Sequence, residues 1–419
     1  MEKLLKIASD QAEQAEVFYY EDSSDSIEFT DGKLEKADSS MSSGVALRLI
    51  KDGKTGFAHT RNLLDPDLLV RQALLSADNG MEVGFSFPKT ETVPIVQSYH
   101  PSIEYLSKKE LIDRGLDLIS YVKSRSDAQF NLGIEYSVDS GGIMNSAGTA
   151  LNQKRSGFMV YAQMIFPGTG SGLSKFRQGN RRKWLSHQDM DEMIELFEIS
   201  KTQIVPPTGQ MPVIFYPTTV YALMSRLLEG INPANIYNKV SPLCGRQGER
   251  IVSEQFNLRQ DPFDEEMSSA TGFDAEGMPT QKLSFFEQGV LGAIPLDLNY
   301  AHKLGMTPTG NGLRGSIESM PTPYPFNLSI DTGDKSLSEM IAGIDRGIIV
   351  HSLMGAHSGN ILNGDFSVGV STGFLIEGGK LSGRVKDCML SGNVYDALNR
   401  IVDIEDTALI MGGKFPSIM

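Results

Sequence analysis

The chain opens with apolar residues at the spacing of an α-helix, three and four positions apart between Leu4 and Ala15. Short apolar runs then follow one another closely, and the turn dipeptides Asp31-Gly32 and Asp52-Gly53 help to separate them. These runs predict strands, paired as an antiparallel meander, at residues 17–20, 27–30, 33–41, 44–50 and 55–60. Asp65-Pro66 then begins a helix that extends to about residue 79, since aspartate caps a helix and proline fits its first position.

The same order of elements recurs in the second hundred residues. A capping box at 107–110 precedes a second amphipathic helix. Ile134–Ser137 matches Ile27–Thr30 in residue character. Ser186 caps a second closing helix, whose apolar residues lie at positions i, i+3, i+4 and i+7.

We therefore predict an internal duplication, in which residues 1–79 and 107–201 each form a helix, antiparallel strands and a helix. The repeat ends before Val205–Gly209, where two adjacent prolines lack the amide hydrogens that a helix or a strand ladder needs. An N-terminal α+β domain is accordingly predicted at residues 1–204, and a second domain at residues 210–419.

The second domain begins with a predicted strand at 211–216 and a predicted helix at 218–229. Glycines then interrupt short apolar runs, with one further helix at 336–344. This pattern predicts a mainly antiparallel β domain. The fold class is therefore α+β, with a duplicated helix, meander and helix followed by a β-rich C-terminal domain.

Composition and charge exclude several classes of protein. With 38 Lys and Arg against 52 Asp and Glu, the formal net charge is −14, so the whole molecule does not attract nucleic acid or an anionic membrane. Two cysteines are too few for a disulfide framework or a thiolate metal site. No signal peptide and no apolar run of about 20 residues is present. We expect a cytoplasmic protein.

Six strings in the second half, taken together in their order and spacing, resemble one family, the TldD/PmbA proteins, which are also called modulators of DNA gyrase. The strings are Phe273–Thr280, Glu287–Leu291, Thr309–Arg314, His357–Asn360, Gly364–Ser367 and Phe374–Gly378. The resemblance covers nearly the whole chain and implies a peptidase-like C-terminal domain.

The TldD branch of this family resembles zinc metallopeptidases that carry the motif H-E-x-x-x-H on the first helix of the second domain. Aligned on Leu228–Gly230, this chain has Tyr221 and Ala222 in place of the first histidine and the glutamate, and Arg226 in place of the second histidine. An arginine cannot release its proton to bind zinc, and alanine offers no base.

The sequence is thus similar to the PmbA (TldE) branch, whose members resemble non-catalytic partners of a TldD subunit. The resemblance implies no catalytic residue, metal or cofactor in this chain, and zinc in a TldD-type partner. It also implies unfolded or leader peptides as substrates, which bind in extended form.

Two glycine-rich loops persist although the metal motif is lost, and we expect them to form a peptide groove or a subunit interface. The candidate residues are Asn311, Arg314, His357, Ser358, Asn360 and Asp365.

Two alternatives remain open. The first is an independent homodimeric peptidase with a non-standard metal site, for which His351, His357 and Asp365 are the candidate ligands. The second is a regulator that associates with DNA gyrase or nucleic acid through the one basic patch, at residues 175–184.

Overall fold

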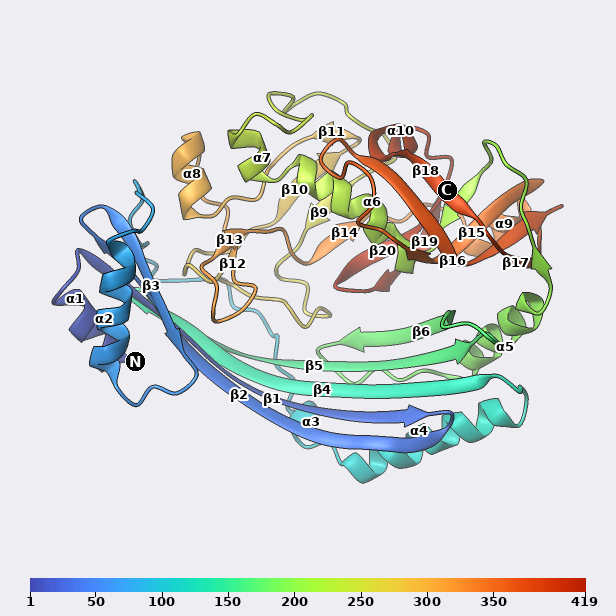
Figure 1. Cartoon of the computed structure of the whole chain (residues 1–419), viewed down its shortest axis with the longest axis horizontal. Coiled ribbons are helices and arrows are strands. Elements are labelled where there is room, and N and C mark those ends of the chain that lie inside the picture. Colours follow the sequence, from blue (N-terminus) through green and yellow to red (C-terminus); the bar gives the residue numbers. More distant parts are fainter.

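The N-terminal part of the chain is a curved six-stranded antiparallel sheet, shown by a computed structural model that describes residues 1–419 (Figure 1). Its strand order is β3-β2-β1-β4-β5-β6. The strands are β1 (Gln14–Thr30), β2 (Lys33–Lys51), β3 (Lys54–Thr60), β4 (Gln129–Asn145), β5 (Ala150–Ile165) and β6 (Gly172–Gly179).

Two strands of this sheet are longer than the sequence predicts. The predicted strands at 17–20 and 27–30 are one strand, β1, and those at 33–41 and 44–50 are one strand, β2. The polar stretches between them contain no apolar alternation, so they look like breaks in the sequence. In the structure they continue the ladder, which pairs Gln14 with Ile50 at one end and Thr30 with Lys33 at the other.

The predicted duplication of element order is present. The helices of this half are α1 (Glu2–Ser9), α2 (Pro66–Ala77), α3 (Pro101–Glu104), α4 (Lys108–Lys123) and α5 (His187–Ser200). Each copy therefore has three strands between helices, and the two copies meet where β1 pairs with β4. The predicted caps also form: Asp65 accepts a hydrogen bond from the Leu68 amide, and Ser186 and Asp189 make a reciprocal capping box.

The C-terminal half contains a mixed twelve-stranded sheet. Most of its neighbours are antiparallel, but β14 with β20, β15 with β8, and β17 with β7 are parallel pairs. Its strands are β7 (Gln203–Ile204), β8 (Val213–Phe215), β9 (Leu258–Gln260), β10 (Leu283–Glu287), β11 (Val290–Leu291), β14 (Leu328–Ile330), β15 (Arg346–Met354), β16 (Asp365–Glu377), β17 (Lys380–Val385), β18 (Met389–Asn393), β19 (Ile404–Ile410) and β20 (Gly413–Ile418).

Short elements complete this half. Two strands form a separate small ladder, β12 (Gly312–Leu313) with β13 (Thr322–Pro323). The helices are α6 (Pro217–Gly230), α7 (Pro233–Tyr237), α8 (Leu298–Leu304), α9 (Leu337–Ala342) and α10 (Val394–Asn399). None of the helices combines the length and the hydropathy that crossing a bilayer requires.

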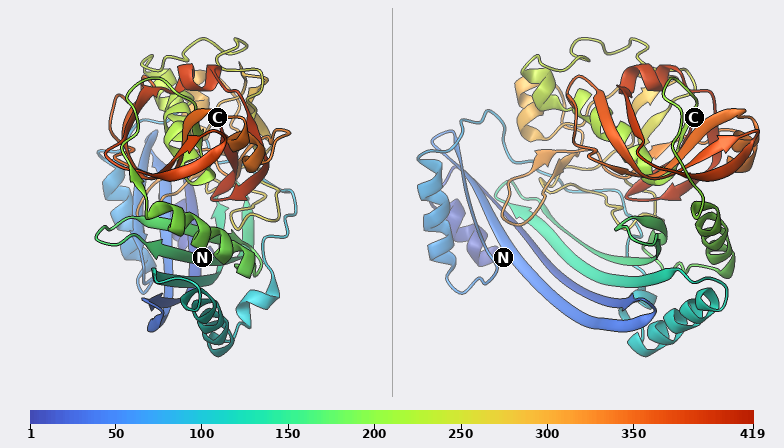
Figure 2. Two further views of the ribbon diagram at one scale, coloured as in Figure 1. Left: turned by 90° about the vertical axis from the view of Figure 1, so that its right-hand side faces the viewer. Right: turned by 45° about the vertical axis from the view of Figure 1, so that its right-hand side comes forward.

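The concave face of the N-terminal sheet is turned toward the C-terminal half, as the views in Figures 1 and 2 agree. Residues 78–100, which we call the connecting segment, form no regular helix or strand and run between the two halves. Thr90 donates to the Gly277 carbonyl at 2.7 Å, and the Gln97 amide donates to Glu265 at 3.1 Å. The connecting segment therefore ties the C-terminal loops to the end of the first repeat.

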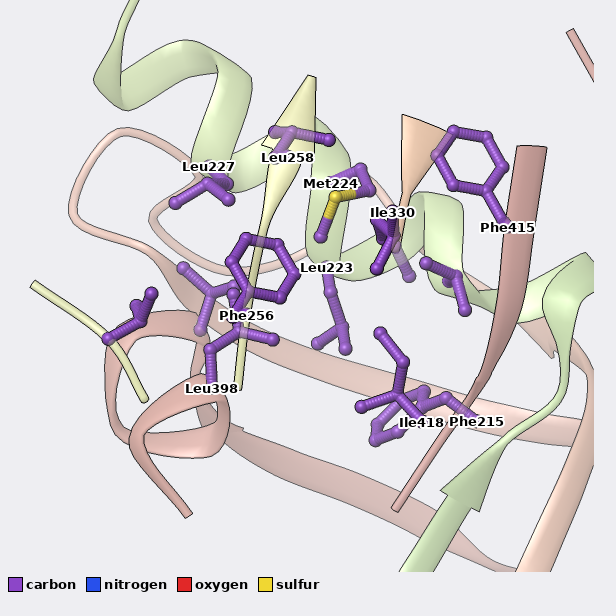
Figure 3. Close-up of a cluster of buried hydrophobic side chains, with 14 of the residues drawn as sticks. Phe215, Leu223, Met224, Leu227, Phe256, Leu258, Ile330, Leu398, Phe415 and Ile418 are labelled. Carbon is purple, nitrogen blue, oxygen red and sulfur yellow. The ribbon is translucent and has the colours of Figure 1, made fainter. Parts of the chain in front are cut away.

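The two copies of the repeat are attached to the C-terminal half in different ways. The core of the second copy is continuous with that half, because Ile214, Ile349 and Phe374 belong to the same buried cluster as α4 and α5. The core of the first copy contains residues 4–77 only. A separate apolar cluster of 34 residues fills the C-terminal half around α6 (Figure 3).

We predict that Leu227→Ala in α6 lowers the free energy of unfolding by about 2–5 kcal/mol, because this side chain is fully buried in that apolar cluster and its loss leaves a cavity. Urea denaturation followed by circular dichroism measures the change. Leu75→Ala in α2 is the matched control, since Leu75 is 68% exposed and its loss should change the value by less than about 0.5 kcal/mol. Equal effects of the two substitutions would contradict the packing described here.

Candidate functional site

Helix α6 carries Tyr221, Ala222 and Arg226, the three positions that the resemblance aligns with the metal motif. Proline at its first turn follows an extended Tyr216, and the apolar face of the helix packs into the C-terminal core, with Leu223, Met224 and Leu227 side by side (Figure 3). Tyr221 is 41% exposed, whereas Ala222 and Arg226 are buried. The helix is thus preserved by its packing and not by a metal.

The guanidinium of Arg226 is fully engaged inside the protein. Nη1 donates to the carbonyl of Ala222, Nε to the carbonyl of Asp365 and Nη2 to the carbonyl of Ser358, each at 2.7 Å. Burial lowers the pKa of Arg226 from its ordinary value. Even so, arginine stays charged in proteins, and here its N–H groups face oxygen acceptors. Arg226 therefore holds the loop between β15 and β16 against α6.

That loop brings four of the predicted candidates together. His357, Ser358, Asn360 and Asp365 all lie between the end of β15 and the start of β16. The side chain of Asn360 accepts from the Asn363 amide at 3.2 Å, and Asp365 accepts from Asn393 of the neighbouring β18 at 3.0 Å. Two glycines of the loop, at φ +98° and +89°, adopt conformations that other residues rarely take.

The other two candidates lie elsewhere and do not reach a surface groove. Asn311 is fully buried, where it donates to Gln260 at 2.8 Å and to the Tyr324 carbonyl at 3.0 Å. Arg314 has a 3% exposed side chain that donates to Glu16 of β1 at 3.2 Å. We therefore leave both out of the peptide or partner surface.

The proposed alternative ligands do not assemble into a metal site. His351 is packed between the rings of Tyr216 and Phe374, at 4.3 and 5.7 Å between centroids, and its burial lowers its pKa to about 4. His357 lies instead in the exposed part of the loop. No group of three or more His, Cys, Asp or Glu side chains in the chain is arranged to hold a metal ion.

The residues at the family's metal position do not fit zinc either. Arg226 offers N–H donors in place of a lone pair, and Ala222 offers neither a ligand nor a base. Tyr221 alone cannot supply the nitrogen and carboxylate set of a catalytic zinc site. No chemical step through a metal is available to this chain at this position.

A groove of about 430 Å³ opens beside the start of α6, and the sequence did not reveal it. It is lined by side chains of β6 and the loop after it, by Tyr216 and Pro217, and by Glu405 and residues 407–410 of β19. Both β6 and β19 are at sheet edges, since β6 ends the N-terminal sheet and β19 pairs only with β20. Glu405 is the acidic residue that lines this groove, and no recognisable sequence motif surrounds it.

Four of the five positive charges of the basic patch, all except Arg181, form ion pairs. Arg177 contacts Asp189 at 2.5 Å, and Lys175 contacts Asp189 at 3.4 Å and also pairs with Glu192. Lys183 pairs with Glu266 at 3.1 Å. These carboxylates balance the charges that a nucleic acid would otherwise meet.

Comparisons with known proteins agree with this description of the fold. A Methanothermobacter thermautotrophicus protein named a metalloprotease is 26% identical, over 95% of this chain and 89% of its own length. The structure of TldE from Thermococcus kodakarensis superposes with a TM-score of 0.92 at 23% identity, covering 100% of this chain and 98% of that one. A Thermotoga maritima protein whose name refers to modulation of a DNA gyrase gives 0.88 at 26% identity, with 100% and 97% coverage.

Profiles of protein families match both halves of the chain. The PmbA/TldA metallopeptidase domain 1 matches residues 15–77. The PmbA/TldA metallopeptidase C-terminal domain matches residues 208–419, which is half of the sequence. The chain therefore belongs to the PmbA/TldD family of metallopeptidase-related proteins.

Proposed function

We propose that this chain is a non-catalytic, TldE-like subunit of a two-component metallopeptidase that processes or degrades unfolded or leader peptides. The observation that carries the proposal is the buried guanidinium of Arg226, which donates to three carbonyl oxygens at a position that the resemblance aligns with a zinc-binding histidine. A TldD-type partner supplies the zinc and the general base.

The surface beside the loop between β15 and β16 suits a stable association with a partner subunit. Met354 and Met389 both lie opposite Gly369 of β16, on either side of it, and are 57% and 68% exposed. Exposed methionines are common at adaptable protein-binding surfaces. A pair of subunits that encloses peptides needs an obligate interface of roughly 2,000 Å² or more with an apolar centre, and these side chains suit such a centre.

The groove between β6 and β19 supports a role in holding peptides. An extended peptide can add to an exposed strand edge through main-chain hydrogen bonds, and two such edges border this groove. Main-chain recognition accepts many sequences, which suits unfolded substrates. We therefore assign peptide positioning to this chain and bond cleavage to its partner.

We predict that the purified chain alone cleaves no unfolded peptide, and that an equimolar mixture with the TldD-type protein of the same organism does. The reason is that neither subunit contains both the metal site and the complete peptide-binding surface. Cleavage of an unfolded, fluorescently labelled casein measures the activity. A mixture in which the motif glutamate of the TldD-type protein is changed to glutamine is the control for contaminating proteases.

Two outcomes would refute the subunit role. One is cleavage by this chain alone at a rate comparable to that of the mixture. The other is full activity of the TldD-type protein without this chain.

A second prediction concerns Arg226→Met, which keeps the approximate length of the side chain and removes its three hydrogen bonds. Buried carbonyls then lose their donors, so the free energy of unfolding falls by about 3–5 kcal/mol. Residues 355–365 should also exchange their amide hydrogens faster, as measured by mass spectrometry. Arg250→Met is the control, because Arg250 is exposed and pairs only with Glu254, and it should change stability by less than about 1 kcal/mol. Unchanged exchange in 355–365 would show that Arg226 does not hold this loop.

A further inference from the structure

Six charged side chains are buried where the first copy of the repeat meets the C-terminal half. We call this set, in which every side chain is at most 3% exposed, the buried charge cluster. Its members are Glu16 of β1, Arg48 of β2, Asp274 and Glu276 of the loop before β10, Asp297 at the start of α8, and Arg314 after β12. The cluster thus joins a sheet of the N-terminal half to three loops of the C-terminal half.

The ion pairs of this cluster form one connected series, because neighbouring pairs share Arg48 or Glu16. Arg48 contacts Glu16 and Glu276, each at 2.8 Å, and Arg314 contacts Glu16 at 3.2 Å. Two phenylalanines of the connecting segment, Phe85 and Phe87, lie 5.7 and 4.9 Å from the Arg48 guanidinium carbon and shield it from water. Arg48 therefore links Glu16 of the N-terminal sheet to Glu276 of a C-terminal loop.

Two carboxyl groups of the cluster have no such partner. Neither Asp274 nor Asp297 forms an ion pair, so four carboxyl groups share two guanidinium groups. Asp274 instead accepts three main-chain hydrogen bonds, from Glu276, Met278 and Gly312. If all six groups were ionised, the dry interface would carry an excess of negative charge, which is costly.

Asp297 and Glu276 meet at the first turn of α8. Asp297 accepts from the Tyr300 amide at 2.7 Å, and Glu276 accepts from the Leu298 amide at 2.7 Å while its other oxygen holds Arg48. The charged groups that act on Asp297 are Glu276, Arg48 from β2, and Lys303 from α8 itself. Of the remaining titratable groups of α8, Tyr300 has a raised pKa and His302 packs against Gly84 of the connecting segment.

We propose that the Glu276–Asp297 pair makes the contact between the first repeat and the C-terminal half sensitive to pH. While Asp297 carries a proton, it is neutral beside Glu276 and the Arg48–Glu276 ion pair is undisturbed. When Asp297 ionises, two adjacent buried carboxylates repel each other, and the carboxylate that holds Arg48 is the one affected. The contact between the halves then loosens.

The direction of the pH effect depends on whether Asp297 binds its proton more tightly when the first repeat and the C-terminal half are in contact (the closed form) or when they are separated. Burial, and then the charge of Glu276, raise the pKa of Asp297 to about 7 in the closed structure, against an ordinary value of 3.8. The closed form is therefore favoured at pH values below 3.8, loses that advantage as the pH rises toward 7, and stays at its weakest above 7. Near neutral pH, a small change in acidity changes the strength of the contact.

Hydrogen exchange of the full-length chain at pH 5.5 and 7.5, corrected for the intrinsic rate, tests this inference. We expect the opening equilibrium of peptides within 44–50 and 273–280 to rise at least about 10-fold at the higher pH, since each pH unit below the pKa of the closed form changes it about 10-fold. Peptides within 220–228 of the C-terminal core provide an internal reference that should not change in this way.

The variant Asp297→Asn separates charge from structure, because asparagine also caps a helix and remains neutral. We expect the gain in melting temperature of this variant over the parent chain to be larger at pH 8 than at pH 5.5 by at least about 3 °C, and the variant to lose the 10-fold change in exchange. Asp65→Asn, at the exposed cap of α2, is the matched control and should give no such pH-dependent gain.

Each outcome of the melting and hydrogen-exchange experiments either supports or contradicts the proposal. A gain of Asp297→Asn that grows between pH 5.5 and pH 8 supports the proposal, whereas an equal change of stability at both pH values would assign Asp297 a structural role only. If the variant does not fold, exchange in the parent chain still decides: no difference between pH 5.5 and 7.5 within 44–50 and 273–280 would overturn the proposal.

Discussion

The contact between the first copy of the repeat and the C-terminal half depends in part on ion pairs that Arg48 makes away from water. The second copy shares an apolar core with the C-terminal sheet. The first copy has a core of its own, and it meets the C-terminal loops through the buried charge cluster and through a small apolar cluster of Ile50, Phe87 and Leu298. Buried ion pairs contribute little net stability but are strongly destabilising when one partner is lost. They consequently constrain how the first copy is oriented against the C-terminal loops, whereas the shared apolar core of the second copy holds β6 beside the C-terminal half.

In the function proposed for this chain, Arg226 takes the position of a metal ligand while its surroundings are kept. A zinc ion would hold α6 by ligand bonds, and Arg226 joins α6 to Ser358 and Asp365 by two hydrogen bonds, with a third to Ala222 inside the helix. A charge is buried in both cases and satisfied by the groups around it. On this proposal, arginine removes a catalytic position and leaves the loop available as a binding surface.

Local patterns in the sequence predicted the order of helices and strands, because caps such as Asp65 and Ser186 and the spacing of apolar residues act over only a few positions. The continuity of β1 and β2 could not be predicted, since their polar middle stretches are held by pairing with distant strands. The assignment of Asn311 and Arg314 to a surface failed to anticipate their burial for a similar reason. Their partners Gln260 and Glu16 are 51 and 298 positions away, and no spacing reveals them.

The central claim is that this chain contributes binding surface and its partner contributes zinc. Native mass spectrometry of the co-purified complex tests it most directly, because the mass of each subunit released in the gas phase shows which one retains the metal. The account predicts about one zinc per pair of subunits, all of it on the TldD-type subunit. Zinc retained by the subunit described here, and lost from its Arg226→Met or His357→Ala variant, would contradict the account.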